Sequence, residues 1–481
     1  MKTIILLYGS LCFSGLLAAA PPGAQNATGS DDPVPAYVPP PVSTLAPVKL
    51  PPIQEKILKN GLKVIIVEFH EVPVVALRLQ CRAGSFFDPP GKAGLIQFMT
   101  GLLTQGTESL SATQIAEKID FVGGNISASS GWDASNVECS VLKKHLNVAV
   151  DLLRDVALHP AFAEDEIERL RQQTLSSIKN AKDQPDNLAD EEFDKWLFGG
   201  FPYAQPIGGT EASVASFTRD DVLAQYHKIF LPNQATLAVI GDVTAKDGFR
   251  IAENMFGDWK TGSLPEVATQ PPQPPQGYRI HIVDKADATQ AQIRLGHLGV
   301  ARHTEDYFPL VVMNYILGGG GFASRMMKTI RAELGLTYGI GSSFSMRRQA
   351  GPFIIDTFTK NESTLQAIQE TIKLVKKFQE EGPTEKELAD AKSYLEGSYP
   401  LNFETPGQIA GQLLNIDLYR LGADYIEKYR SRVVAVTAAD VKRVARRYIH
   451  PDDLNIVVVS KVDEVKSALE SLGPVEVITV E

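Results

Sequence analysis

Arg331 and Tyr338 are seven residues apart, and the pattern of this segment predicts that they lie on either side of one turn of the chain. The sequence predicts a helix over 322–334 and a strand over 336–344, with Gly335 between them in the left-handed conformation that ends many helices. A guanidinium and a phenol pointing into one cleft would be hydrogen-bond donors for a peptide carbonyl. In the simpler interpretation, Arg331 complements the helix C-terminus and Tyr338 is a core aromatic residue.

A run of four glycines, Gly318, Gly319, Gly320 and Gly321, precedes this helix. It lacks the Gly-Lys-Ser/Thr ending of a phosphate-binding loop and the strand–glycine–helix spacing of a dinucleotide site. Because glycine permits unusual backbone angles, the run predicts either a mobile loop that senses a ligand or a tight connection into the helix.

The eight histidines form no metal-binding pattern, because no two of them are three to five residues apart. The sequence also contains no His-x-x-Glu-His, Cys-x-x-Cys or Gly-x-Ser-x-Gly motif. We therefore expect neither a metal ion nor a catalytic nucleophile on this chain.

The elements that must position these residues occur twice. Thr218 and Thr437 each begin a predicted helix, and the prolines and the strands that follow these helices are related by the same offset of 219 positions. A constant offset over about 20 residues indicates an internal duplication. The irregular mixture of strands and helices predicts an α+β fold, with two homologous domains of mixed β-sheet covered by helices in a clam-shell arrangement. A proline-rich linker at 263–276 separates an N-terminal domain at 51–262 from a C-terminal domain at 277–475.

Length and composition agree with a globular protein of several domains. The chain has 481 residues, of which 44% are hydrophobic and 22% are charged. Its formal net charge of −10 disfavours nucleic acid as a partner, because phosphate binding needs a basic surface. The acidic surface either favours basic peptides or serves solubility alone.

The first 20 residues predict a signal peptide, because Met1-Lys2 is followed by apolar residues that end in Ala18-Ala19-Ala20. Residues 21–50 predict a Pro/Ala-rich leader, and no later segment is apolar enough to span a membrane. We expect an exported protein, which is periplasmic if the source is a Gram-negative bacterium. Cys81 and Cys139 lie in predicted strands, either as a disulfide or as two separate buried thiols.

The segment from Pro89 to Thr107 resembles the zinc-site helix of the pitrilysin/insulinase family, which includes mitochondrial processing peptidase. The family carries His-x-x-Glu-His between an upstream Gly-Leu and a downstream Gly-Thr, and both parts of this frame are present as Gly94-Leu95 and Gly106-Thr107. The resemblance implies a degenerate zinc site. The residues at its four functional positions are Gln97 and Gly101 in place of the two histidines, Thr100 in place of the glutamate, and Ser177 in place of the third ligand.

The second half keeps its resemblance to the family. Arg331 and Tyr338, in Arg-x-Glu-x-Gly-Leu-x-Tyr, are similar to the family's substrate-binding signature, and the glycine run is similar to the glycine-rich loop of the non-catalytic processing-peptidase subunit. The resemblance covers roughly residues 52–475. It implies a non-catalytic, substrate-binding subunit of a heterodimeric zinc peptidase, in which a homologous partner chain supplies the zinc and both chains bind a peptide.

The alternative is a structural or peptide-binding scaffold with no role in proteolysis, similar to the family's core subunits of respiratory complex III. The presence of Arg331 and Tyr338 in their frame disfavours it. The sequence does not indicate the substrate or the identity of the partner.

Overall fold

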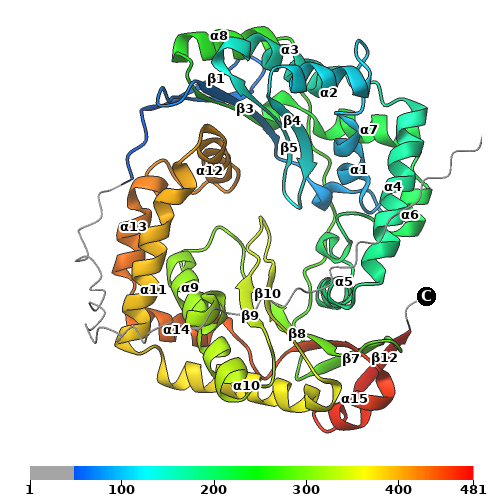
Figure 1. Ribbon diagram of the computed structural model, residues 1–481, viewed down its shortest axis with the longest axis vertical. Helices are drawn as coiled ribbons and strands as arrows, with labels where there is room; N and C mark the ends of the chain where they lie inside the picture. Colours follow the sequence, from blue (N-terminus) through cyan, green and yellow to red (C-terminus); the bar gives the residue numbers. More distant parts are fainter. Residues whose placement is uncertain (1–47, 480–481) are drawn as a thin grey trace, which may run out of the picture. The chain divides into compact units, whose positions relative to one another are not determined.

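The computed structural model describes residues 48–479. The predicted signal peptide and residues 21–47 of the predicted leader lie outside this range. Within it, two six-stranded mixed sheets carry helices on their faces, which confirms the α+β fold (Figure 1). No helix in residues 48–479 has the length and apolar composition to cross a membrane.

The first sheet has the order β1-β2-β6-β3-β5-β4, and its only parallel pair of neighbours is β2 and β6. Its strands are β1 (Ile53–Ile57), β2 (Lys63–Glu68), β3 (Val74–Cys81), β4 (Asn125–Ser130), β5 (Ser135–Leu142) and β6 (Ala235–Gly241). Its half of the chain contributes the helices α1 (Leu95–Leu102), α2 (Ala112–Phe121), α3 (Leu146–Leu158), α4 (Glu164–Lys182), α5 (Pro185–Phe198), α6 (Glu211–Ala215), α7 (Arg219–Ile229) and α8 (Ala245–Phe256).

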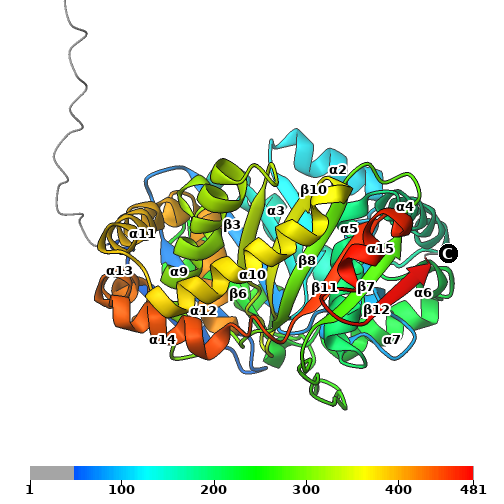
Figure 2. The same ribbon diagram turned by 90° about the horizontal axis from the view of Figure 1, so that it is seen from below.

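The second sheet has the order β12-β7-β11-β8-β10-β9, and α10 and α15 lie over it (Figure 2). Its strands are β7 (Arg279–Asp284), β8 (Ala291–Leu298), β9 (Ile340–Phe344), β10 (Pro352–Thr359), β11 (Asn455–Ser460) and β12 (Val475–Thr479). The helices of this half are α9 (Tyr307–Asn314), α10 (Thr364–Glu381), α11 (Glu385–Ser398), α12 (Pro406–Leu418), α13 (Tyr425–Ala435), α14 (Ala438–Tyr448) and α15 (Val462–Leu469).

The offset of 219 residues relates equivalent elements of the two halves. Thr218 caps α7 by accepting a hydrogen bond from the Asp221 N–H, and Thr437 caps α14 through Asp440 in the same way. The strands β6 and β11 then occupy the same position in their sheets. The halves differ at one sheet edge, where the first uses its N-terminal strand β1 and the second its C-terminal strand β12.

One strand of the first half was not predicted from the sequence, and the structure decides between the two predictions for the cysteines. The predicted strand that contains Cys139 is β5, and the structure pairs it with a further strand, β4, in a hairpin between α2 and α3. The sequence of β4, Asn-Ile-Ser-Ala-Ser-Ser, consists mostly of small polar residues, so it lacks the apolar pattern by which a strand is usually predicted.

Cys139 pairs in register with Leu77 and Cys81 with Ser135, so the two cysteines are about 13 Å apart along neighbouring strands. Both are free buried thiols, and burial raises each pKa to about 12.

Each sheet is apolar on both faces, and each half supplies a helix that covers the sheet of the other half. The helix α12 packs against β3 and β6 of the first sheet, and α5 packs against β8 and β11 of the second (Figure 1). Burying one large apolar side chain contributes about 1.5–3 kcal/mol, so these two helices bind the halves together strongly. The buried residues from the two helices include Ile409, Leu413 and Leu414 on α12 and Leu188, Phe193 and Leu197 on α5.

A buried carboxylate joins the halves at the turn between β4 and β5. Asp133 is 5% exposed. Its oxygens accept hydrogen bonds from the Tyr203 hydroxyl (2.9 Å), the Tyr419 hydroxyl (3.1 Å) and the Arg348 backbone N–H (2.7 Å). Two of these donors come from the second half, so Asp133 fixes the β9–β10 loop and the end of α12 against the first half.

We expect Asp133→Ala to lower the free energy of unfolding by about 3 kcal/mol, because three donors would lose a buried acceptor. Urea unfolding of the full chain measures this loss. The exposed carboxylate of Asp258 offers a matched control, since Asp258→Ala should leave the urea midpoint unchanged. Equal midpoints for both variants would contradict the role assigned to Asp133.

Candidate functional site

The helix that carries three of the degenerate positions, α1, begins at a carboxylate cap. Asp88 accepts hydrogen bonds from the backbone N–H groups of Gly94 and Ile96, both at 2.8 Å. Gly94 has φ +83° and lies against Gly209, where a Cβ atom would come within 2.4 Å of the backbone. The Gly-Leu frame at the start of α1 is therefore explained by the backbone conformation and by close packing.

The side chains at the degenerate positions make structural contacts. The Gln97 side-chain oxygen accepts a hydrogen bond from the Ser130 N–H of β4 (3.2 Å), and the Thr100 hydroxyl is fully buried. A Cβ atom at Gly101 would lie 3.4 Å from Leu170 of α4, so this position marks the contact between α1 and α4. Ser177 is exposed two turns further along α4. Residues 48–479 contain no cluster of three His, Cys, Asp or Glu side chains that could hold a metal ion.

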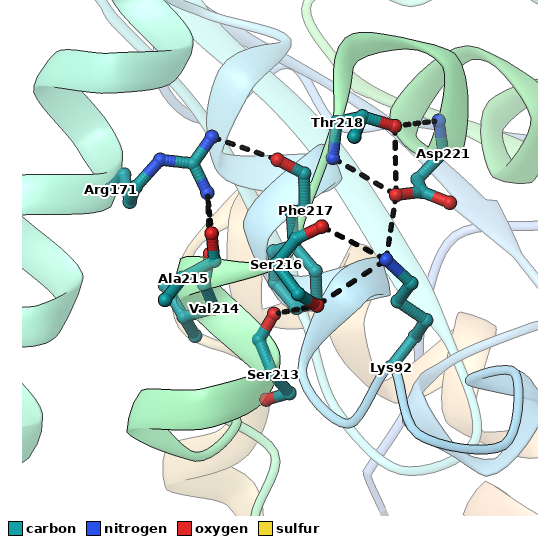
Figure 3. A network of polar contacts seen from close by, with 9 residues as sticks. All are labelled: Lys92, Arg171, Ser213, Val214, Ala215, Ser216, Phe217, Thr218 and Asp221. Carbon is teal, nitrogen blue, oxygen red and sulfur yellow. Dashed lines mark hydrogen bonds and ion pairs between the residues drawn. The ribbon is translucent and has the colours of Figure 1, made fainter.

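Two cations hold α1 and α4 on the same segment of the first half (Figure 3). Just before α1, Lys92 donates to the Ser216 carbonyl (3.0 Å) and to Asp221 (2.8 Å). From α4, Arg171 donates to the carbonyl of Phe217 (2.8 Å) and to that of Val214. The scaffold that positions the two helices is thus complete, although the side chains that a zinc site needs are absent.

In the second half, Arg331 lies between two exposed aromatic rings. Its guanidinium carbon is 4.4 Å from the centre of the Tyr338 ring and 4.5 Å from that of Phe322. Tyr338 is 75% exposed and Phe322 is 74% exposed, so Tyr338 is not a core residue. Within residues 48–479, no carboxylate or carbonyl accepts a hydrogen bond from the Arg331 side chain. Stacking fixes the guanidinium plane and leaves its N–H groups free to donate to a ligand.

Phe322 was not among the predicted site residues. Its sequence signal is a large aromatic residue directly after four glycines, where no core position is expected. The segment 322–334, predicted as one helix, contains a short 3₁₀ turn and a π-helix, which is wider than an α-helix. Residues 321–323 form a 3₁₀ turn, and Met327–Glu333 is a π-helix. Gly335 follows two residues after its end, with φ +62°. The strand β9 starts at Ile340 rather than at 336, so Tyr338 lies in the connection that precedes it.

The glycine run makes close contacts. A Cβ atom at Gly318 would come within 2.4 Å of the Ser342 hydroxyl, and one at Gly320 within 2.6 Å of the Tyr315 carbonyl. Gly321 has φ +53°. These contacts favour the tight connection over the mobile loop, and the connection places Phe322 beside Arg331.

An ion pair anchors the short helix that carries Arg331. The Arg325 Nε and Nη2 atoms donate to the two carboxylate oxygens of Glu387, each at 2.7 Å. Burial raises the pKa of Glu387, but the Arg325 guanidinium and the N–H and hydroxyl of Thr384 outweigh it and lower the pKa to about 2. The helix is therefore attached to the start of α11.

The degenerate positions and the Arg331 group belong to different halves. Among the residues that the structure describes, no hydrogen bond or ring contact joins the two groups. Each group is held by its own half: α1 and α4 by Lys92 and Arg171, and the Arg331 group by the glycine run and Arg325.

Two profiles of one protein family match the chain, one mainly in each half. The profile described as "Insulinase (Peptidase family M16)" matches residues 63–211, and that described as "Peptidase M16 inactive domain" matches residues 216–395. The chain belongs to this family, and the histidines and glutamate of its zinc motif are absent at positions 97, 100 and 101.

Relatives and solved structures extend over most of the chain. An uncharacterized zinc protease of Bacillus subtilis, YmxG, is 28% identical over 72% of this chain and 83% of its own length. A non-peptidase homolog of Helicobacter pylori is 24% identical over 84% of this chain and 93% of its own. A crystal structure of a peptidase M16 inactive domain from Pseudomonas fluorescens has a TM-score of 0.80 at 28% identity, and covers 85% of this chain and 98% of that one.

If α1 and α4 keep the family's arrangement, the triple variant Gln97→His, Gly101→His and Ser177→Glu should bind one zinc ion per chain, because it supplies three ligands. A Cβ atom at Gly101 would make an ordinary van der Waals contact with Leu170. Equilibrium dialysis with metal analysis measures binding. The double variant that retains Ser177 is the control and should bind zinc more weakly. A folded triple variant without zinc would show that the two helices are not aligned for a metal.

We expect Glu387→Gln to lower the free energy of unfolding at pH 7 by about 2 kcal/mol, because the native state favours the ionised carboxylate. The folded pKa is depressed, so this stabilisation is complete above the ordinary pKa of 4.5 and is lost as the pH falls toward about 2. Denaturant unfolding at pH 7 and pH 3 should therefore give a smaller difference from the unsubstituted chain at pH 3. Exposed Glu385→Gln is the control, and a difference independent of pH would contradict this assignment.

Proposed function

We propose that this chain is the non-catalytic, substrate-binding subunit of an exported, heterodimeric zinc peptidase. Its partner is a homologous chain that carries His-x-x-Glu-His and supplies the zinc. The observation that carries the proposal is the half-buried guanidinium of Arg331, which lies against the exposed rings of Phe322 and Tyr338 and donates no side-chain hydrogen bond within residues 48–479.

The hydrogen-bond donors of Arg331 and Tyr338 suit the negative charge that develops on the carbonyl oxygen during peptide hydrolysis. A tetrahedral oxyanion is stabilised by preorganised N–H and O–H groups, and one such donor is worth about 2.7–4 kcal/mol of barrier. The two ring contacts hold the guanidinium before a peptide arrives, so little side-chain freedom is lost on binding. Arg331 and Tyr338 would act on a peptide bond that the partner's zinc-bound water attacks.

An open sheet edge supports peptide binding in the first half. β4 is the last strand of its sheet, and the Ser130 N–H points away from β5 to the Gln97 side chain. By the alternation of an antiparallel strand, the N–H groups of Ala128 and Ile126 point outward as well. An extended peptide can add to such an edge through its main chain. The degenerate position Gln97 thus lies at the end of the edge that would hold the peptide.

The experiment mixes the purified chain with a family member that contains His-x-x-Glu-His from the same genome. Mixing should create peptidase activity that neither chain has alone. Arg331→Ala should reduce kcat/KM about 100-fold, because one oxyanion donor is lost, and Tyr338→Phe should reduce it less. Tyr394→Phe and Arg250→Ala alter an exposed tyrosine and an exposed arginine elsewhere and should retain full activity.

Two outcomes would overturn the proposal. Full activity of the mixture with both Arg331→Ala and Tyr338→Phe would refute the substrate-binding role. Activity of this chain alone that a chelator abolishes would show that it carries its own metal centre.

A further inference from the structure

A cavity of about 440 Å³ lies where the two halves meet, and its charged lining residues are all basic. Arg82 follows β3, Arg348 lies in the β9–β10 loop, and Arg420 follows α12. His303, which precedes α9, completes the set, and no Asp or Glu is among the lining residues. Three arginines from three separate segments thus converge in a chain whose formal net charge is −10.

The arginines differ in how their charge is balanced. Arg82 forms an ion pair with Asp417 at 2.8 Å, and Lys63 next to it contacts both Asp417 and Glu55. Two carboxylates therefore balance these two cations. In residues 48–479, neither the Arg348 nor the Arg420 guanidinium forms an ion pair.

The position of Arg348 is fixed by neutral groups. Its Nη2 atom donates to the carbonyl oxygens of Arg82 (2.9 Å) and Asp133 (3.1 Å). Its backbone N–H donates to the buried Asp133 carboxylate, which the Tyr203 and Tyr419 hydroxyls also contact. The guanidinium is therefore held at the cavity by carbonyl oxygens, and within residues 48–479 no carboxylate accepts a hydrogen bond from it.

Arg420 adopts an unfavourable backbone conformation. Its φ is +53°, and Phe162 is the one other non-glycine residue with positive φ in the described part of the chain. It stands after α12, where the Leu421 N–H returns to the Ile416 carbonyl at 3.0 Å. Glycine usually takes this position, and a side chain there costs about 1 kcal/mol. The residue at this position is an arginine, and it lines the cavity.

We propose that this cavity binds a small phosphate-type anion with two or more negative charges. Guanidinium groups match phosphate oxygens in paired hydrogen bonds, and the Arg348 and Arg420 guanidinium groups would gain an anionic partner on binding. Because Arg82 belongs to the first half and the other two arginines to the second, the anion would bridge the halves and stabilise their contact.

The test is thermal unfolding and calorimetric titration of the full chain with inorganic tripolyphosphate, at an ionic strength held constant with NaCl. We expect a saturable rise in Tm and one binding site per chain. Arg348→Gln and Arg420→Gln should each weaken binding about tenfold, through loss of a charge-assisted contact. Arg250→Gln, an exposed arginine on α8, should bind as the unsubstituted chain does.

If the glutamine variants unfold easily, Arg420→Gly provides a second test of binding in a stable chain. Glycine suits a positive φ, so the ligand-free variant should unfold at the same or a higher temperature while its binding of tripolyphosphate weakens. The proposal fails if tripolyphosphate raises Tm no more than NaCl does. It also fails if the rise is unchanged in both Arg348→Gln and Arg420→Gly.

Discussion

The structure depends on the burial of both faces of each sheet. On β2, Val64 and Ile66 face the helices of the first half, whereas Ile65 and Val67 face α12 from the second half. The same alternation occurs on β11, whose second face is covered by α5. An exposed apolar sheet face would be costly in water, so neither half is complete without the helix of the other. This exchange makes residues 48–479 part of one compact unit.

Close packing and burial also explain why the residues that frame the zinc-site positions are present although the zinc ligands are absent. Gly94 is needed for a positive φ and for close contact with Gly209, and α1 is buried through Leu95, Ile96 and Phe98. These residues build the core of the first half whether or not a metal is present. The four functional positions contribute little to that core except Thr100, so their side chains can change while the helices stay in place.

Contacts within the second half position the Arg331 group. Ring stacking and the glycine connection hold Arg331, and the ion pair of Arg325 with Glu387 holds its helix. At the junction of the halves, the contacts around Asp133 place Arg348 beside Arg82 and Arg420. Within residues 48–479, the Arg331, Arg348 and Arg420 side chains form no ion pair, and such guanidinium groups can donate hydrogen bonds to a carbonyl or an anion.

The sequence alone determined the duplication, the helix caps at Thr218 and Thr437, the left-handed Gly335 and the absence of zinc ligands, because these are properties of residue type and local spacing. Tertiary structure decided which helix covers which sheet, the stacking of Phe322 on Arg331, the separation of Cys81 from Cys139 and the meeting of three arginines. Those features depend on strand register and on contacts between segments far apart in the chain, and residue spacing carries no information about either.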